Sequence, residues 1–125
     1  MKKIVGIFVA SIILIYGIMF INTNNVLDDF KELKLFKAES NKDYGRLYGA
    51  YYREDLEGKI KNVDLKCNRI FVVHNFKKGM MVVRYSNITY DYNDEVTDGN
   101  KNAISKWYIE KKNGRWVVVD IDEKP

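Results

Sequence analysis

The chain begins with an apolar segment that has no polar face. Residues 4–21 read IVGIFVASIILIYGIMFI, eighteen residues without a charged side chain. As an α-helix this segment would extend about 27 Å, close to the hydrocarbon thickness of a bilayer. A helix on the surface of a soluble core is usually apolar on one face only. The pattern therefore predicts a membrane-spanning helix over residues 4–21.

The flanks of this segment predict its direction across the membrane. Lys2 and Lys3 precede it, whereas the first charges after it are Asp28 and Asp29. Because cytoplasmic flanks carry the excess of Lys and Arg, residues 1–3 are expected in the cytoplasm. The predicted location is the cell membrane, with a single pass, a cytoplasmic N-terminus and an extracytoplasmic C-terminal domain.

A cleavable signal peptide is the main alternative to a permanent anchor. Its apolar core is about 7 to 15 residues long and ends at small residues of the A-x-A type. Here the core is longer, and the residues after it, 22–25, are Asn-Thr-Asn-Asn, a poor cleavage context. A lipoprotein signal needs a cysteine directly after the core, but the only cysteine is Cys67. A type IV pilin would carry a glutamate early in the apolar helix. A signal-anchor is therefore favoured, with cleavage as the open alternative.

Two amphipathic helices are predicted after a polar linker at residues 22–25. Apolar side chains recur at helical spacing over residues 26–36, with aspartates in the first turn, where the helix dipole favours acids. Ser40 and Asp43 resemble a capping box for the second helix. That helix is predicted over residues 44–53, because a tyrosine-rich face repeats there at helical spacing.

From about residue 59 onward the apolar positions alternate with a period of two, which indicates β-strands. The expected strands cover residues 60–65, 69–75, 80–92, 103–111 and 115–122. A change of apolar phase near Ser86 and Asn87 predicts a β-bulge. The polar, acidic residues 93–102 are predicted to form a loop.

Two short segments predict hairpin turns. Lys77, Lys78 and Gly79 separate two of the strands. Asn113-Gly114 separates the last two, and it favours a type I′ turn because both central residues of that turn need positive φ. The predicted class is therefore α+β: a transmembrane helix, then two helices packed on a bent antiparallel sheet of four to five strands.

The composition fits one folded domain over residues 26–125. The chain is 46% hydrophobic and 14% aromatic with a single proline, which is enough material for one core. Cys67 has no second cysteine to pair with, so packing must stabilise the domain, and this thiol is expected to be buried and inert. The net charge is +4, and the bases are interspersed with acids. No nucleic-acid binding is expected, because that requires concentrated cations.

Six residues are candidates for a pocket or an interface. They are His74, Tyr48, Tyr51, Tyr85, Tyr90 and Trp107. The lone histidine has a pKa suited to a general base, although a histidine in a strand is more often a hydrogen-bonded core or rim residue. The tyrosines fit either a helix-on-sheet core with hydroxyls at its rim or an exposed aromatic binding surface. No catalytic residue and no cofactor are predicted.

Calcium is the one metal for which the sequence offers a partial pattern. Asp91, Asn93 and Glu95 present alternating oxygen ligands. An EF-hand loop, however, requires glycine at its sixth position and glutamate at its twelfth, where this chain has Val96 and Asn102. The prediction is a solvated acidic loop and no metal site.

The last two predicted strands share a style of sequence with a known superfamily. Trp107-Tyr108, Gly114-Arg115-Trp116 and the following VVVDI of residues 117–121 resemble the final hairpin of the nuclear-transport-factor-2-like (NTF2-like) superfamily. Residues 59–63, KIKNV, resemble its entry into the sheet, and the likeness extends over residues 26–122. It implies a cystatin-like cone of helices on a bent sheet, often dimeric, which serves as enzyme, binding pocket or assembly module. It carries over no catalytic residue.

These observations predict a non-enzymatic interaction module that residues 4–21 hold in the membrane. Membrane-anchored proteins resembling this layout include periplasmic components of conjugation and type IV secretion machines, so a protein partner or a second copy is expected. Two alternatives stay open. One is an immunity protein against an extracytoplasmic toxin, and the other is a small-molecule pocket with or without enzymatic activity.

Overall fold

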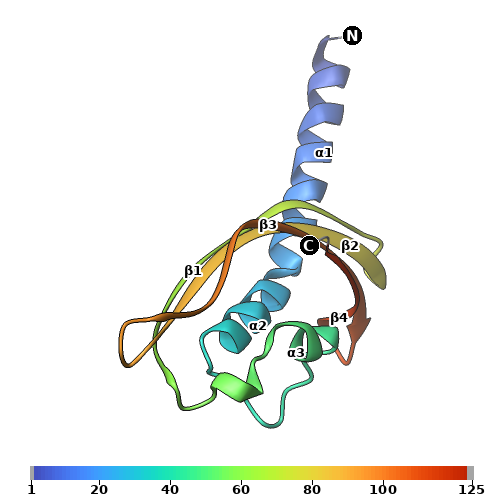
Figure 1. The fold of residues 1–125 in the computed structure, drawn as a ribbon. Coiled ribbons are helices and arrows are strands. Elements are labelled where there is room, and N and C mark those ends of the chain that lie inside the picture. Colours follow the sequence, from blue (N-terminus) through green and yellow to red (C-terminus); the bar gives the residue numbers. More distant parts are fainter. Residues whose placement is uncertain (1, 124–125) are drawn as a thin grey trace.

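The structure is a computed structural model that describes residues 2–123. A long helix, α1 (Lys2–Asn22), stands out from a four-stranded antiparallel sheet that is open, not closed into a barrel (Figure 1). The other helices are α2 (Asn24–Lys34), α3 (Arg46–Tyr51) and the 3-10 helix η1 (Glu54–Leu56). The strands are β1 (Ile60–His74), β2 (Lys78–Asp91), β3 (Val96–Lys112) and β4 (Arg115–Glu123), in the order β1-β2-β3-β4. The prediction of an α+β chain with a long apolar helix ahead of an antiparallel sheet is confirmed.

Most of the apolar segment of α1 extends outside the folded domain, and only its end, at Gly17, Met19 and Phe20, is half-buried. No residue of α1 is fully buried within the protein, and the length and composition of the helix suit a membrane anchor or a signal sequence. Only Thr23 separates α1 from α2, so the interruption is shorter than the expected linker over residues 22–25. The Thr23 hydroxyl bonds back to the carbonyl oxygens of Met19 and Phe20, 3.3 and 3.1 Å away. The polar side chain therefore finds its partners within the helical junction, and the chain continues with little interruption.

The first strand is a single element. The prediction of separate strands over residues 60–65 and 69–75 is wrong, because β1 continues through Lys66 and Asn68. These polar side chains point to the exposed face, while their neighbours Leu65 and Cys67 are half-buried on the other. The register with β2 shifts between Arg69 and Phe71, just after the predicted interruption at residues 66–68.

The third strand begins earlier than expected. Residues 96–102 were predicted to be a loop, but they form the start of β3 and pair with β2 in the register Thr89 to Asp98 and Asn87 to Asn100. A register shift between Tyr85 and Asn87 lies where the sequence predicted a β-bulge, but the predicted placement of the bulge within the strand over residues 80–92 is wrong. The extra residue lies in β3, where the backbone N–H of Asn102, at φ 50°, donates to the Ser86 hydroxyl at 2.8 Å.

The two hairpin turns differ in how well the sequence predicted them. Asn113 and Gly114 have φ values of 52° and 81°, so the predicted turn with two positive φ angles is confirmed. The turn before β2 lies earlier than expected, since the Asn75 side chain accepts hydrogen bonds from the backbone N–H groups of Lys77 and Lys78. Gly79 belongs to β2, where a Cβ atom would come within 2.4 Å of His74. The absence of a side chain at Gly79 therefore allows β1 and β2 to lie close together at this position.

The helix α3 is shorter than the predicted span of residues 44–53. Its N-cap is Gly45, at φ 59°, and the expected capping box of Ser40 and Asp43 does not form. The Asp43 carboxylate instead accepts a hydrogen bond from the Gly45 N–H at 2.8 Å. A Cβ atom at Gly45 would lie 2.2 Å from the carbonyl oxygen of Val118, so the approach to β4 requires glycine at the helix start.

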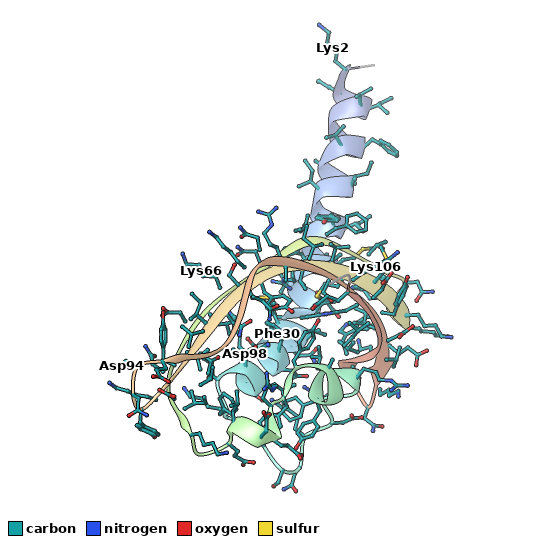
Figure 2. All side chains as sticks on the ribbon, viewed as in Figure 1. Lys2, Phe30, Lys66, Asp94, Asp98 and Lys106 are labelled. Carbon is teal, nitrogen blue, oxygen red and sulfur yellow. The ribbon has the colours of Figure 1, made fainter. Side chains whose placement is uncertain are left out.

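Aromatic rings fill the space beneath the arched sheet. Phe30, from α2, lies at the centre of this region and is fully buried (Figure 2). Its ring centroid is 5.0 Å from that of Tyr51, 5.1 Å from that of Trp107 and 5.2 Å from that of Tyr85. Three elements of the domain therefore meet at one phenylalanine.

Candidate functional site

Three of the six candidate residues meet around one carboxylate at the end of β4. The hydroxyl of Tyr51 donates to Glu123 at 2.7 Å, and that of Tyr85 donates to the same carboxylate at 2.8 and 2.9 Å. The indole N–H of Trp107 donates to the Tyr51 oxygen at 3.1 Å, and the Ser105 hydroxyl lies 2.9 Å from it. We call these five residues the tyrosine–glutamate cluster.

The environment of the tyrosine–glutamate cluster keeps both tyrosines neutral. Burial is the main cause that raises the pKa of Tyr51 and of Tyr85 above the ordinary tyrosine value, and hydrogen bonding to Glu123 raises both further. Each phenol therefore serves as a hydrogen-bond donor to the carboxylate. Neither is activated as a nucleophile or a base, because that would require a lowered pKa.

A buried lysine, which the sequence did not single out, lies beside this cluster. Lys34 is only 7% exposed, and its Nζ lies 5.3 Å from the ring centroid of Tyr51 and 5.6 Å from that of Tyr85. Burial lowers the pKa of Lys34, while the charges of Asp98 and Glu123 act to raise it. The positive charge of Lys34 thus offsets the negative charges of Asp98 and Glu123, and the amine also lies within cation–π distance of the rings of Tyr51 and Tyr85. Its position four residues after Phe30, on the buried face of α2, is the signal that could have revealed it.

His74 lies apart from the cluster, next to the last strand. Its ring centroid is 4.6 Å from that of Trp116 and 4.8 Å from that of Phe76. Nδ1 accepts a hydrogen bond from the Phe76 N–H at 3.0 Å, while Nε2 has no hydrogen-bond partner within residues 2–123. No carboxylate orients the ring, so its contacts are those of a core residue beside the helical junction.

Stability should fall with acidification through the unfolded pKa of His74. Burial, the largest cause, and the charge of Lys111 lower the pKa of His74 below 6.5, whereas the backbone of Met19 acts in the opposite direction. Below pH 6.5 the unfolded chain therefore binds the proton first, and stability decreases until the folded pKa is reached. Denaturant unfolding at a series of pH values should show this slope, and His74→Gln should flatten it. An unchanged slope in the variant would contradict the assignment.

The other two candidates do not join a common site. Tyr48 is 41% exposed, stacks on Tyr52 at 4.9 Å and donates its hydroxyl to Glu54 at 3.0 Å. Tyr90 lies five residues beyond Tyr85 on β2, so it points to the opposite face of the sheet and is half-buried there. The candidate tyrosines therefore divide between the interior and the surface.

The remaining candidate chemistry is structural. Within the part of the chain that the structure describes, no three His, Cys, Asp or Glu side chains could hold a metal ion together. The Asp91 carboxylate accepts hydrogen bonds from the N–H groups of Asn93 and Glu95, at 2.8 and 3.0 Å, and so organises the turn. Cys67 is half-buried, and burial raises the pKa of its thiol to about 11. A thiol that stays protonated at neutral pH is a poor nucleophile.

The helical junction between α1 and α2 carries a second set of contacts that the sequence did not predict. The indole N–H of Trp116 donates to the Asn22 side chain at 2.6 Å. The Asn25 side chain donates to the carbonyl oxygen of Trp116 at 2.7 Å and accepts from its backbone N–H at 3.2 Å. These bonds, between residues about ninety positions apart, fasten the junction to β4.

The opposite edge strand holds the same junction. The guanidinium of Arg69, from β1, lies 4.1 Å from the ring centroid of Phe20. The same side chain donates to the Phe20 carbonyl oxygen and, at 3.3 Å, to the Thr23 hydroxyl. Side chains from both edges of the open sheet therefore bind the end of α1. These contacts fix the direction in which the apolar helix leaves the domain.

Trp116→Phe should destabilise the chain by at least about 1 kcal/mol, because it removes the hydrogen bond to Asn22 and leaves part of the space of a buried indole unfilled. Denaturant unfolding of the full chain in detergent micelles measures the change. Tyr108→Phe is a matched control, since the structure gives its half-exposed hydroxyl no hydrogen bond, and it should leave stability unchanged. Equal stabilities of the Trp116 variant and the parent would contradict the role of this bond.

Comparisons with known protein families, with curated proteins and with solved structures found no match. The function must therefore be inferred from the contacts of the chain's own residues.

Proposed function

We propose that this protein is a membrane-tethered interaction module, anchored through residues 4–21, whose α+β domain works on the extracytoplasmic side. One observation carries the proposal: residues 4–21 of α1 carry no charge and are exposed as far as Tyr16, yet the domain holds the end of the helix from both edges of the sheet. An apolar helix without a protein partner is stable in a bilayer and a liability in water.

The distribution of charge supports the proposed orientation. Lys2 lies at the end of α1 far from the domain (Figure 2), and it is followed by a second lysine. Asp28 and Asp29 lie on α2, beyond the other end of the apolar segment. This asymmetry favours a cytoplasmic N-terminus under the positive-inside rule.

The filled interior supports an interaction module over a small-molecule pocket. Phe30 and Trp107 are fully buried beneath the sheet, and their rings occupy the centre where a cone-shaped domain would hold a ligand. The ring contacts of Phe30 with Tyr51 and Tyr85 support the finer part of the proposal, in which α2 and α3 pack on the concave side of a bent sheet. That arrangement is the one the NTF2-like resemblance implies.

The long β2–β3 hairpin supports a protein partner or a second copy. Its outer part, residues 88–96, extends beyond the helices (Figure 1) and exposes apolar side chains. Tyr92 is 68% exposed and Val96 is 61% exposed. Exposed aromatic residues are enriched in interfaces between proteins.

Crosslinking and affinity capture from native membranes test this function. The full chain is expected in the membrane fraction, crosslinked to a defined partner or to a second copy. A Tyr92→Ser, Val96→Ser variant should stay in the membrane but lose that crosslink. Recovery of the parent chain only as a lone monomer would count against the proposal. A toxin gene adjacent to the coding gene, with protection of cells by this chain, would favour the immunity alternative.

A further inference from the structure

We propose that the convex face of the sheet lies directly on the bilayer that α1 enters, so that the domain is seated on lipid and not suspended above it. This inference rests on the proposed function, because it requires α1 to span the membrane. The residues of this lipid-facing patch are Phe71, Val73, Met80, Val82, Ile104 and Tyr108.

Strand alternation places the lipid-facing patch on one side of the sheet. Val72, Met81 and Trp107 are fully buried on the concave side, so their neighbours in sequence point the other way. The pairing register aligns Phe71 with Val82, Val73 with Met80, and Met80 with Tyr108. The patch is thus continuous across three strands, with Phe71, Val73 and Ile104 more than 40% exposed.

Contacts with the end of α1 fix the position of the lipid-facing patch along the helix axis. The ring of Tyr16, within the apolar segment, lies 6.4 Å from the ring of Phe71, centroid to centroid. The Tyr16 hydroxyl also accepts a hydrogen bond from the backbone N–H of Val72 at 3.4 Å. Phe71 is therefore level with Tyr16 along the helix.

The length of α1 then brings the patch to the membrane. Residues 4–21 span about 27 Å, and Tyr16 lies about 7 Å short of their end, at 1.5 Å per residue. Residues 4–15, which lie before the first contact with the domain, span only about 18 Å, against a hydrocarbon thickness of about 30 Å. The helix cannot cross the bilayer unless the level of Tyr16 and Phe71 reaches the lipid interface. Figure 1 shows α1 leaving on the convex side of the sheet, as this seating requires.

The charged side chains around the lipid-facing patch are of both signs, so the contact with lipid is expected to be mainly apolar. Cations and acids are both present on the convex face. Lys106 aligns with Asp122, Lys78 pairs with Glu110, and Lys66 and Arg84 are accompanied by Asp64 and Asp120. Lys66 and Lys106 lie on opposite flanks of the sheet (Figure 2), and Lys106 Nζ lies 5.4 Å from the ring centroid of Tyr108. Long cationic side chains at the edge of an apolar surface can extend to lipid headgroups. With the charges balanced, docking should depend little on anionic lipid.

Depth measurements on the full chain in vesicles test the seating. In a Cys67→Ser background, single cysteines at Val73→Cys, Tyr92→Cys and Ile12→Cys are labelled with an environment-sensitive fluorophore. The protein is reconstituted into phosphatidylcholine vesicles, with or without brominated chains as quenchers. The label at position 73 is expected to be quenched at least twofold more strongly than the label at position 92, which lies on the distal hairpin. Adding anionic lipid should leave this ratio unchanged.

The three positions separate the possible failures. Quenching at position 12 without quenching at position 73 would overturn the seating and leave the anchor intact. An absence of quenching at position 12 would overturn the anchor, and with it the proposed function. Quenching at position 73 that appears only with anionic lipid would overturn the apolar contact in favour of an electrostatic one.

Discussion

Phe30→Ala is expected to lower the free energy of unfolding by about 3 to 5 kcal/mol, the usual loss for a fully buried phenylalanine. The ring is completely buried and lies within 5.2 Å, centroid to centroid, of the rings of Tyr51, Tyr85 and Trp107. Its removal leaves a cavity between α2 and the sheet that these rigid rings cannot fill by small movements. A domain of this size has only about 5 to 15 kcal/mol of stability to lose.

Denaturant unfolding of the full chain, followed by tryptophan fluorescence, measures this loss, because Trp107 is itself in contact with Phe30. Tyr92→Ala is the matched control: it also removes an aromatic ring, but from a side chain that is 68% exposed. It should change stability by less than about 0.5 kcal/mol. Similar losses in the two variants would show that Phe30 is not the centre of the core.

Arg115→Met should lower the free energy of unfolding by about 3 kcal/mol or more, because it leaves a buried carboxylate without its closest cation. Asp29 has a side chain only 3% exposed, and Arg115 donates to its two oxygens at 2.6 and 2.7 Å. Lys42 remains 3.4 Å away and offsets part of the loss. Lys61→Met is the control, since the Lys61–Asp94 pair is exposed and such pairs contribute about 0 to 1 kcal/mol.

The pH dependence of the free energy of unfolding shows whether the loss in Arg115→Met is electrostatic. Burial, the largest influence, raises the pKa of Asp29, while Arg115 and Lys42 act to lower it. Without the arginine the folded pKa should rise further, so the folded state binds the proton first and stability falls as the pH increases above 3.8. The deficit of Arg115→Met should therefore be largest at neutral pH and should shrink on acidification. A deficit independent of pH would contradict an electrostatic cause.

Local patterns in the sequence predicted the parts of the fold that depend on neighbouring residues. The long apolar helix follows from the composition of one segment, and the last turn follows from Asn113-Gly114, because few residue pairs accept two positive φ angles. The change of apolar phase near Ser86 pointed to the right position but not to the right strand, because the extra residue lies in β3 and the buried positions of β2 alternate without a break. The helix and the turn are each determined by residues that are adjacent in the sequence.

Features that depend on distant residues were missed. The acidic residues 96–102 resembled a loop, but they gain strand structure by pairing with β2 in an exposed hairpin that buries little. The sequence did not single out Lys34, whose burial depends on the rings of Tyr51 and Tyr85 from other elements. Residues 22–25 were predicted to be a polar linker, whereas the structure shows their side chains bonded to residues of β1 and β4. Sequence periodicity carries no information about such partners.

We infer that α1 is a retained anchor that holds the domain outside the cytoplasm. Cysteine accessibility in intact cells tests it most directly, in a Cys67→Ser background with either Lys3→Cys or Asn93→Cys. A membrane-impermeant maleimide should label position 93 in intact cells and position 3 only after permeabilisation, and mass spectrometry should find residues 2–21 still attached. Labelling of position 3 from outside, or a product that lacks the apolar helix, would contradict the account.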